Sequence, residues 1–126
     1  MKFPENVKYT KEHEWIRVDG DVAYVGITDY AQSQLGDIVF VDVPTEGDTV
    51  DAEEVFGSIE VVKTVSDLFM PVTGKVLEIN SAIDADPSLV NSDPYGAGWI
   101  IKITLLDPSQ MNHLLDVAAY RAIINE

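Results

Sequence analysis

Residues 55 to 72 read Val55-Phe56-Gly57-Ser58-Ile59-Glu60-Val61-Val62-Lys63-Thr64-Val65-Ser66-Asp67-Leu68-Phe69-Met70-Pro71-Val72. The stretch is rich in β-branched and aromatic residues, which favour strands, and Lys63 places one ammonium group near its middle. Lysine ends in a nucleophilic amine, to which acyl-type prosthetic groups can be attached through an amide bond. The ordinary interpretation is a lysine on the solvated face of a strand. The sequence around Lys63 distinguishes an attachment site for a prosthetic group from an ordinary solvated lysine.

Two turn signals flank Lys63 at a distance. One contains Gly47, sixteen residues before the lysine, and the other contains Gly74, eleven residues after it. Each turn joins two β-patterned runs, so the sequence places Lys63 between two hairpin-like halves. Residues 62–65 contain no Gly, Asn, Asp or Pro, and propensity alone predicts a continuous strand there.

Short strands and helices are expected along the rest of the chain. The predicted strands are 15–18, 22–27, 39–43, 76–79 and 99–103, and a hairpin turn is expected at 19–21. Thr28 and Gly36 bound a short helix, residues 87–91 form one helical turn, and Asp107 with Pro108 opens another helix. The pattern predicts a mainly β fold, a small β-sandwich or flattened barrel with short peripheral helices and a C-terminal helix.

The C-terminal helix is expected from Val117 to Ile124, with Asp116 as its cap. Its apolar face, which is expected to pack on the sheet, consists of Val117, Tyr120, Ile123 and Ile124. The same stripe is also compatible with a partner-binding site.

Composition excludes several classes of site. The chain has no cysteine, which rules out disulfides and thiolate chemistry, and its histidines lack the spacing of a zinc-protease helix, so no metal site is expected. A net charge of −14 argues against nucleic acids and anionic membranes as partners. It favours docking on basic protein surfaces, or serves solubility alone. The chain has no span-length apolar run and residues 1–6 resemble no leader, so a cytoplasmic protein is expected.

Blocks over most of the chain carry a family resemblance. In order they are Tyr9-Thr10-Lys11-Glu12-His13-Glu14-Trp15, Gly26-Ile27-Thr28, Gly36-Asp37-Ile38-Val39-Phe40-Val41, Met70-Pro71-Val72-Thr73-Gly74 and Asn91-Ser92-Asp93-Pro94-Tyr95-Gly96-Ala97-Gly98-Trp99. Together with Glu60-x-x-Lys63, they resemble the lipoyl-carrier (barrel-sandwich hybrid) fold and, more closely, the H proteins of the glycine cleavage system. The resemblance implies one domain, 1–126, with a lipoyl-carrier core at about 22–104 and a C-terminal helical segment at 107–126.

The resemblance also implies a function. Lys63 is expected at an exposed hairpin tip, with lipoate attached to it as the covalent cofactor. The protein is then a non-catalytic, monomeric carrier that shuttles the aminomethyl group of glycine. Its expected partners are the pyridoxal-phosphate-dependent decarboxylase (P protein), the folate-dependent aminomethyltransferase (T protein), dihydrolipoamide dehydrogenase (L protein) and the lipoate-attaching enzymes.

Three acidic residues match positions with a role in that family. Glu14 and Asp67 match acids that line the cleft for the loaded arm, and Glu60 matches the acid that lipoate-attaching enzymes favour. Carboxylates suit such a cleft because they pair with an ammonium group. For Asp67, a cap of the turn after the hairpin tip is the alternative. Glu12 and Val62 depart from the family pattern, in which a small hydroxyl residue and a serine are common at these positions.

Other functions compete with the glycine cleavage carrier. A lipoyl relay, which donates lipoate to other carriers, would have an indistinguishable sequence. A biotin carrier places methionine on both sides of its lysine, whereas Val62 and Thr64 stand here. A hydrolase or metalloprotein has no supporting constellation of histidine or cysteine.

Overall fold

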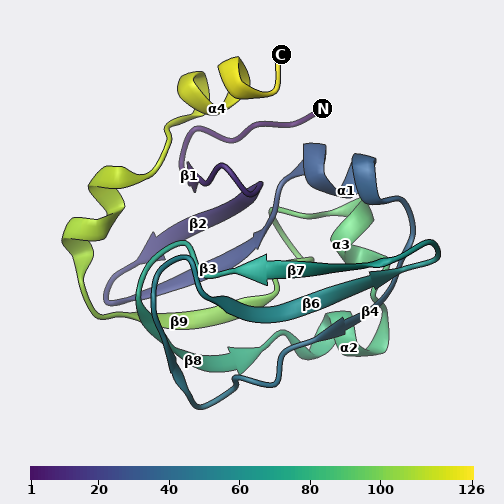
Figure 1. The fold of residues 1–126 in the computed structure, drawn as a ribbon, viewed down its shortest axis with the longest axis horizontal. Helices are drawn as coiled ribbons and strands as arrows, with labels where there is room; N and C mark the ends of the chain where they lie inside the picture. Colours follow the sequence, from purple (N-terminus) through teal and green to yellow (C-terminus); the bar gives the residue numbers. More distant parts are fainter.

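The computed structural model describes residues 1–126 and contains two antiparallel sheets with short helices around them (Figure 1). The larger sheet has the order β1 (Lys8–Tyr9), β2 (Glu14–Asp19), β3 (Val22–Ile27), β9 (Ile101–Leu105), β8 (Gly74–Ile79), β5 (Thr49–Val50). The smaller sheet has the order β4 (Ile38–Asp42), β6 (Val55–Val61), β7 (Val65–Phe69). No strand pairing joins the sheets, so the mainly β fold is confirmed as a sandwich rather than a closed barrel.

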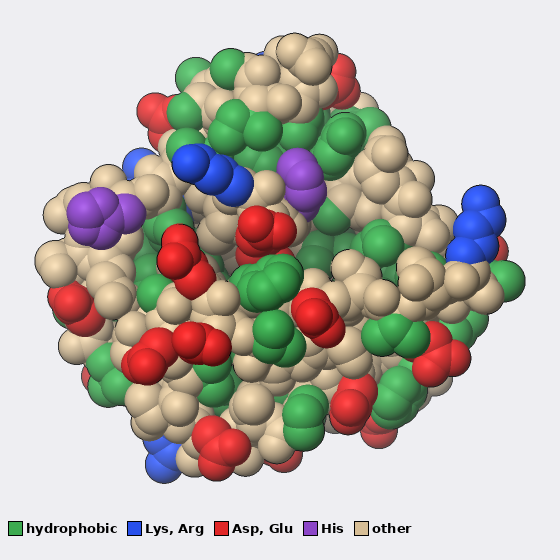
Figure 2. Space-filling view, viewed as in Figure 1, with side chains coloured by type: hydrophobic (Ala, Val, Ile, Leu, Met, Phe, Trp, Pro, Cys, Tyr) green, Lys and Arg blue, Asp and Glu red, His purple; other side chains and the backbone are tan.

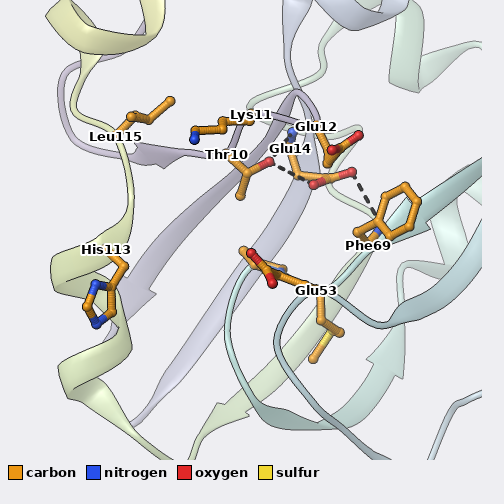
Figure 3. Close-up of a pocket in the computed structure, with 10 residues that line it drawn as sticks. Thr10, Lys11, Glu12, Glu14, Glu53, Phe69, His113 and Leu115 are labelled. Carbon is orange, nitrogen blue, oxygen red and sulfur yellow. Dashed lines mark hydrogen bonds between the residues drawn. The ribbon is translucent and has the colours of Figure 1, made fainter.

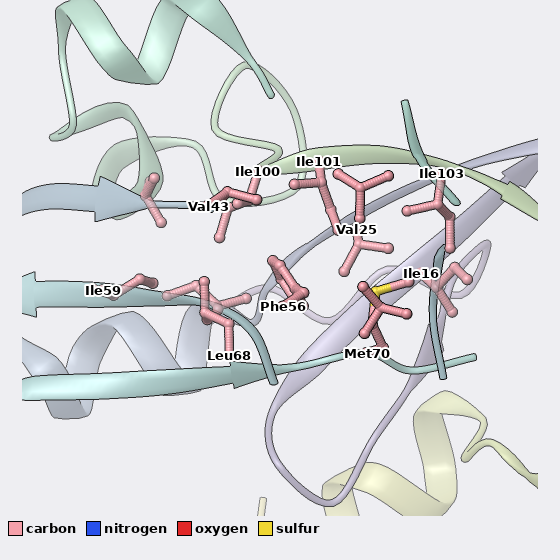
Figure 4. Packing of buried hydrophobic residues seen from close by; sticks show 14 of the residues in the cluster. Ile16, Val25, Val43, Phe56, Ile59, Leu68, Met70, Ile100, Ile101 and Ile103 are labelled. Atoms are coloured by element: carbon pink, nitrogen blue, oxygen red, sulfur yellow. The ribbon is translucent and has the colours of Figure 1, made fainter. Parts of the chain in front are cut away.

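The core lies between the two sheets. Phe56, Ile59 and Leu68 of the smaller sheet are at most 3% exposed and belong to one cluster with side chains of the larger sheet (Figure 4). At the end of β6 next to the hairpin, Glu60 is exposed between buried Ile59 and Val61. Earlier in the strand the alternation is interrupted, because Phe56 and Gly57 are both buried where the register shifts.

Local capping signals fix the starts of three helices as the sequence predicts. The helices are α1 (Asp29–Leu35), α2 (Ser81–Ala85), α3 (Leu89–Ser92), the 3-10 helix η1 (Pro108–His113) and α4 (Val117–Ile123). The side chains of Thr28, Asp107 and Asp116 accept hydrogen bonds from backbone N–H groups in the first turns of α1, η1 and α4. Helix α2, capped by Asn80, was not predicted. None of the helices combines the length and apolar character needed to cross a membrane.

Helix α4 packs at one end of the larger sheet. Tyr120 is fully buried and forms a second apolar cluster with Val7, Tyr9 and Trp15, which confirms the expected contact with the sheet. The prediction is wrong for Ile123, whose side chain is 45% exposed. A seven-residue helix against a sheet edge buries only a narrow stripe, so not every apolar position can reach the core.

The two turns that flank Lys63 do not close hairpins. Residues 43–48 lead from β4 to β5, and residues 70–73 lead from β7 to β8, so each turn carries the chain from one sheet to the other. The prediction of two hairpin-like halves is therefore wrong, and the hairpin is β6–β7 itself. Gly74 lies in β8 rather than in a turn, where a Cβ atom would collide with the carbonyl oxygen of Thr104.

Candidate functional site

Lys63 lies at the tip of the β6–β7 hairpin, which projects from the sandwich (Figure 1). Val61 N–H donates a 2.9 Å hydrogen bond to the carbonyl of Thr64, and the lysine side chain is exposed. The continuous strand predicted from propensity is wrong. Neither Val62 nor Lys63 has a positive φ, so this turn needs no Gly or Asn, and residues 62–65 contain no turn signal.

Glu60 stands on the exposed face of the smaller sheet, close to the tip. It pairs with Val65 on β7 and with Phe40 on β4, and Glu60–Val65 is the last strand pair before the turn. Phe40 and Val65 are 47% and 59% exposed. A protein that binds this face beside Lys63 would therefore contact the Glu60 side chain between two exposed apolar side chains.

A cavity of about 230 Å³ opens beside β7. Its walls come from residues 12–14, from α1 and from β7, and both Glu14 and Asp67 line it. The two predicted cleft acids, which come from strands of different sheets, therefore line one cavity. Glu12, one of the two residues that depart from the family pattern, lines it with them.

A second, larger cavity of about 480 Å³ shares Glu12 and Glu14 with the first. Figure 3 shows the Glu14 carboxyl held between Thr10 and the backbone of Phe69. The other residues that line this larger cavity include Glu53 and the basic residues Lys11 and His113. This second cavity was not predicted, because its lining comes from four separate segments of the chain.

Glu14 is a buried carboxyl without a cation. It is 2% exposed, its Oε1 accepts a 2.8 Å hydrogen bond from Thr10 Oγ1, and its Oε2 accepts a longer one, 3.4 Å, from Phe69 N–H. The only ion pair in the protein joins Lys102 and Glu78. Burial raises the pKa of Glu14 to about 8, against the opposing effect of the two hydrogen bonds. Burial thus favours the protonated form of Glu14, and a cation in the cavity would favour the ionised form.

Asp67 differs from Glu14 in its surroundings. It lies within β7 opposite Ser58, its side chain is exposed, and its carboxylate accepts no hydrogen bond from the protein. The alternative that Asp67 caps the turn is therefore wrong. An exposed carboxylate of this kind attracts a cation only weakly because water screens it.

A hydrogen-bonded group behind the smaller cavity was missed by the sequence analysis. The hydroxyl of Tyr120 lies 2.9 Å from His13 Nδ1 and 2.7 Å from Thr28 Oγ1, and Thr28 N–H donates a 3.0 Å bond to the His13 carbonyl. Tyr120 is 107 residues from His13, so no local pattern indicates their contact. Thr10 was also missed as the partner of Glu14, although the two residues are only four positions apart.

The comparisons with known proteins agree with one another. The family described as "Glycine cleavage H-protein" matches residues 7–126. A glycine cleavage system H protein of Bacteroides fragilis is 65% identical over 125 residues, which is 99% of each chain, and one of Chlorobium limicola is 54% identical over 128 residues. The crystal structure of a glycine cleavage system H protein from Mycobacterium marinum superposes with a TM-score of 0.85 at 39% identity, covering 98% of this chain and 99% of that one.

Proposed function

Because the chain belongs to the glycine cleavage H-protein family, whose members are lipoyl carriers of the glycine cleavage system, we propose that Lys63 is the residue that carries lipoate. The relatives are named for glycine cleavage, so the alternative of a lipoyl relay is not favoured. The observation that carries the assignment is an exposed primary amine at the tip of a projecting hairpin, next to an acid-lined cavity.

The residues present fit a lipoyl-lysine arm. Lys63 is exposed at a hairpin tip, whereas exposed Lys75 and partly buried Lys102 lie within strands of the larger sheet. Asp67 is four residues from Lys63, about 13 Å along an extended strand, so the cavity that it lines is within reach of a long arm. Glu60 is exposed beside the tip, where a lipoate-attaching enzyme would contact it.

When bound, the lipoyl group supplies a disulfide that accepts the aminomethyl group of glycine and is later reoxidised. The protein's own residues hold and shield the loaded arm. Glu14 offers a carboxyl that becomes an anion when a cation enters, and the walls of the cavity keep that pair away from bulk water. Asp67 and Glu12 add negative charge at the mouth.

The carrier role assigns the chemical steps to other proteins. The proposed partners are the decarboxylase, the aminomethyltransferase and dihydrolipoamide dehydrogenase, together with the lipoate-attaching enzymes. A tethered arm raises the effective concentration of the carried group at each active site, which is the physical advantage of a small carrier. A monomeric state and a cytoplasmic location stay predictions.

The test combines mass measurement with substitution. Protein purified from its own organism should carry the mass of one lipoyl group, and peptide mapping should place it on Lys63. Lys63→Arg keeps the charge but removes the acylable amine, so it should fold normally and abolish glycine–bicarbonate exchange. Lys8→Arg is the matched control, because Lys8 is exposed on β1 and lines neither cavity. Lipoate on Lys75 or Lys102, or exchange activity of Lys63→Arg, contradicts the assignment.

A further inference from the structure

Tyr120 connects the C-terminal helix to the walls of the smaller cavity. Its ring is fully buried and stacks on Tyr9, with centroids 4.6 Å apart and an interplanar angle of 6°. The stacking accounts for the ring but not for the hydroxyl, which points away to His13 and Thr28. The two functions of the side chain, packing and hydrogen bonding, are therefore separable by removing one oxygen atom.

The hydroxyl meets two segments that line the smaller cavity. His13 stands between Glu12 and Glu14, and all three residues line that cavity. Thr28 is the N-cap of α1, accepting a 3.1 Å hydrogen bond from Ala31 N–H, and α1 also lines the cavity. The hydroxyl of Tyr120 thus links residues 12–14 to the start of α1.

His13 needs such support because its backbone is strained. Its φ is 70°, in the left-handed region that is uncommon for residues other than glycine, although histidine, like asparagine, adopts it more often than most. A residue in this conformation costs of order 1–3 kcal/mol and persists only where the surroundings fix it. Here the ring packs between Tyr30 and Tyr120, and Nδ1 bonds to the Tyr120 hydroxyl. A shift of His13 would redirect Glu14, the next residue.

We propose that Tyr120 is a positioning residue for the cavity, whose hydroxyl holds the residues 12–14 loop against α1 and so sets where Glu14 meets the loaded arm. The C-terminal helix is then part of the device that protects the carried group, although it contributes no residue to the cavity lining. The inference about the arm rests on the proposed function of the cavity; the inference about the loop and α1 does not.

The experiment compares Tyr120→Phe with Tyr9→Phe in the full-length lipoylated protein. Both variants keep the stacked ring pair and lose one buried hydroxyl, but Tyr9 donates to the carbonyl of Pro4, away from the cavity. The first readout is amide hydrogen exchange at Glu14, Thr28 and Ala31. Tyr120→Phe should speed exchange there roughly three- to tenfold, as expected for one lost hydrogen bond, while Tyr9→Phe should leave these amides unchanged.

The second readout is release of ammonia or formaldehyde from the aminomethyl-loaded proteins, far below their melting temperatures. Tyr120→Phe should shorten the lifetime of the loaded form roughly three- to tenfold, with acylation of Lys63 unchanged. His13→Asn tests the same link from the other side, because asparagine tolerates a positive φ but lacks the ring.

Each outcome decides a separate point. Equal exchange at the three amides in Tyr120→Phe and Tyr9→Phe would overturn the inference, since the hydroxyl would then give only general stability. Faster exchange confined to Tyr120→Phe supports it. If the exchange result holds but Glu14→Gln releases the carried group as slowly as wild type, the proposed function of the cavity fails while the positioning role of Tyr120 stands.

Discussion

The carboxyl of Glu14 accepts a 2.8 Å hydrogen bond from the hydroxyl of Thr10, and no cationic side chain pairs with it. A buried carboxylate without a counter-ion is costly, so the group holds its proton until a cation arrives. The protein surface is acidic: Figure 2 shows acidic side chains spread over one face with few basic ones. Glu14 differs from these in being only 2% exposed.

The first prediction concerns stability and pH. The pKa of Glu14 is raised to about 8 in the folded protein, from 4.5 without burial. Between these values the unfolded chain releases a proton that the folded protein keeps, so the contribution of Glu14 to stability falls as pH rises. Glu14→Gln keeps the shape and cannot ionise. Its stability relative to wild type should therefore increase from pH 5 to pH 8, by roughly 1.4 kcal/mol for each unit of pKa shift.

Urea unfolding at several pH values measures this difference. Glu46→Gln is the matched control, because it makes the same substitution at an exposed turn. A difference between Glu14→Gln and wild type that is independent of pH would mean that Glu14 is ionised throughout the range.

The second prediction separates the cleft acids. In the loaded protein the ammonium of the carried group should pair with Glu14 in a shielded setting, so Glu14→Gln should shorten the lifetime of the loaded form about five- to thirtyfold. Asp67 is exposed, and Asp67→Asn should have a smaller effect, below about fivefold. Ammonia release from each loaded variant gives the rates. Equal rates for wild type and both variants would assign protection to other residues.

The third prediction concerns encounter with partners. A net charge of −14 should speed association with enzymes that present basic surfaces, and salt should screen this attraction. Raising ionic strength from low to physiological values should lower association rates more than it raises dissociation rates. Stopped-flow rates that are flat with salt would leave solubility as the role of the acidic surface.

The fourth prediction tests the correction at Gly74. Gly74→Ala places a methyl group against the carbonyl oxygen of Thr104 in the adjacent strand and should destabilise the fold by about 1–3 kcal/mol. Gly47→Asn is the control, because Gly47 has a φ of 89° and open space around it, a position that asparagine tolerates. Denaturant unfolding of both variants measures the contrast. Equal losses in the two variants would show that the close approach of the Thr104 carbonyl is not what requires glycine at position 74.

Local sequence determined the parts of this protein that depend on neighbouring residues. Thr28 and Asp116 mark the starts of α1 and α4, because capping satisfies N–H groups only two or three residues away. The strand predicted at residues 76–79 lies within β8, because a strand pattern also depends on adjacent residues. Helix α2 was not predicted, because its cap, Asn80, precedes only five helical residues, which are too few for a periodic pattern.

Tertiary structure alone decided the site. The tip at Lys63 has no turn signal, since its residues need no positive φ, and the strands on either side define it by pairing with each other. Glu14 and Asp67 line the same cavity because their strands, β2 and β7, belong to two sheets that pack together as a sandwich. The raised pKa of Glu14 depends on burial, which no single residue encodes. Sequence specifies which groups exist; long-range packing sets their distances and their exclusion from water, and through these their chemistry.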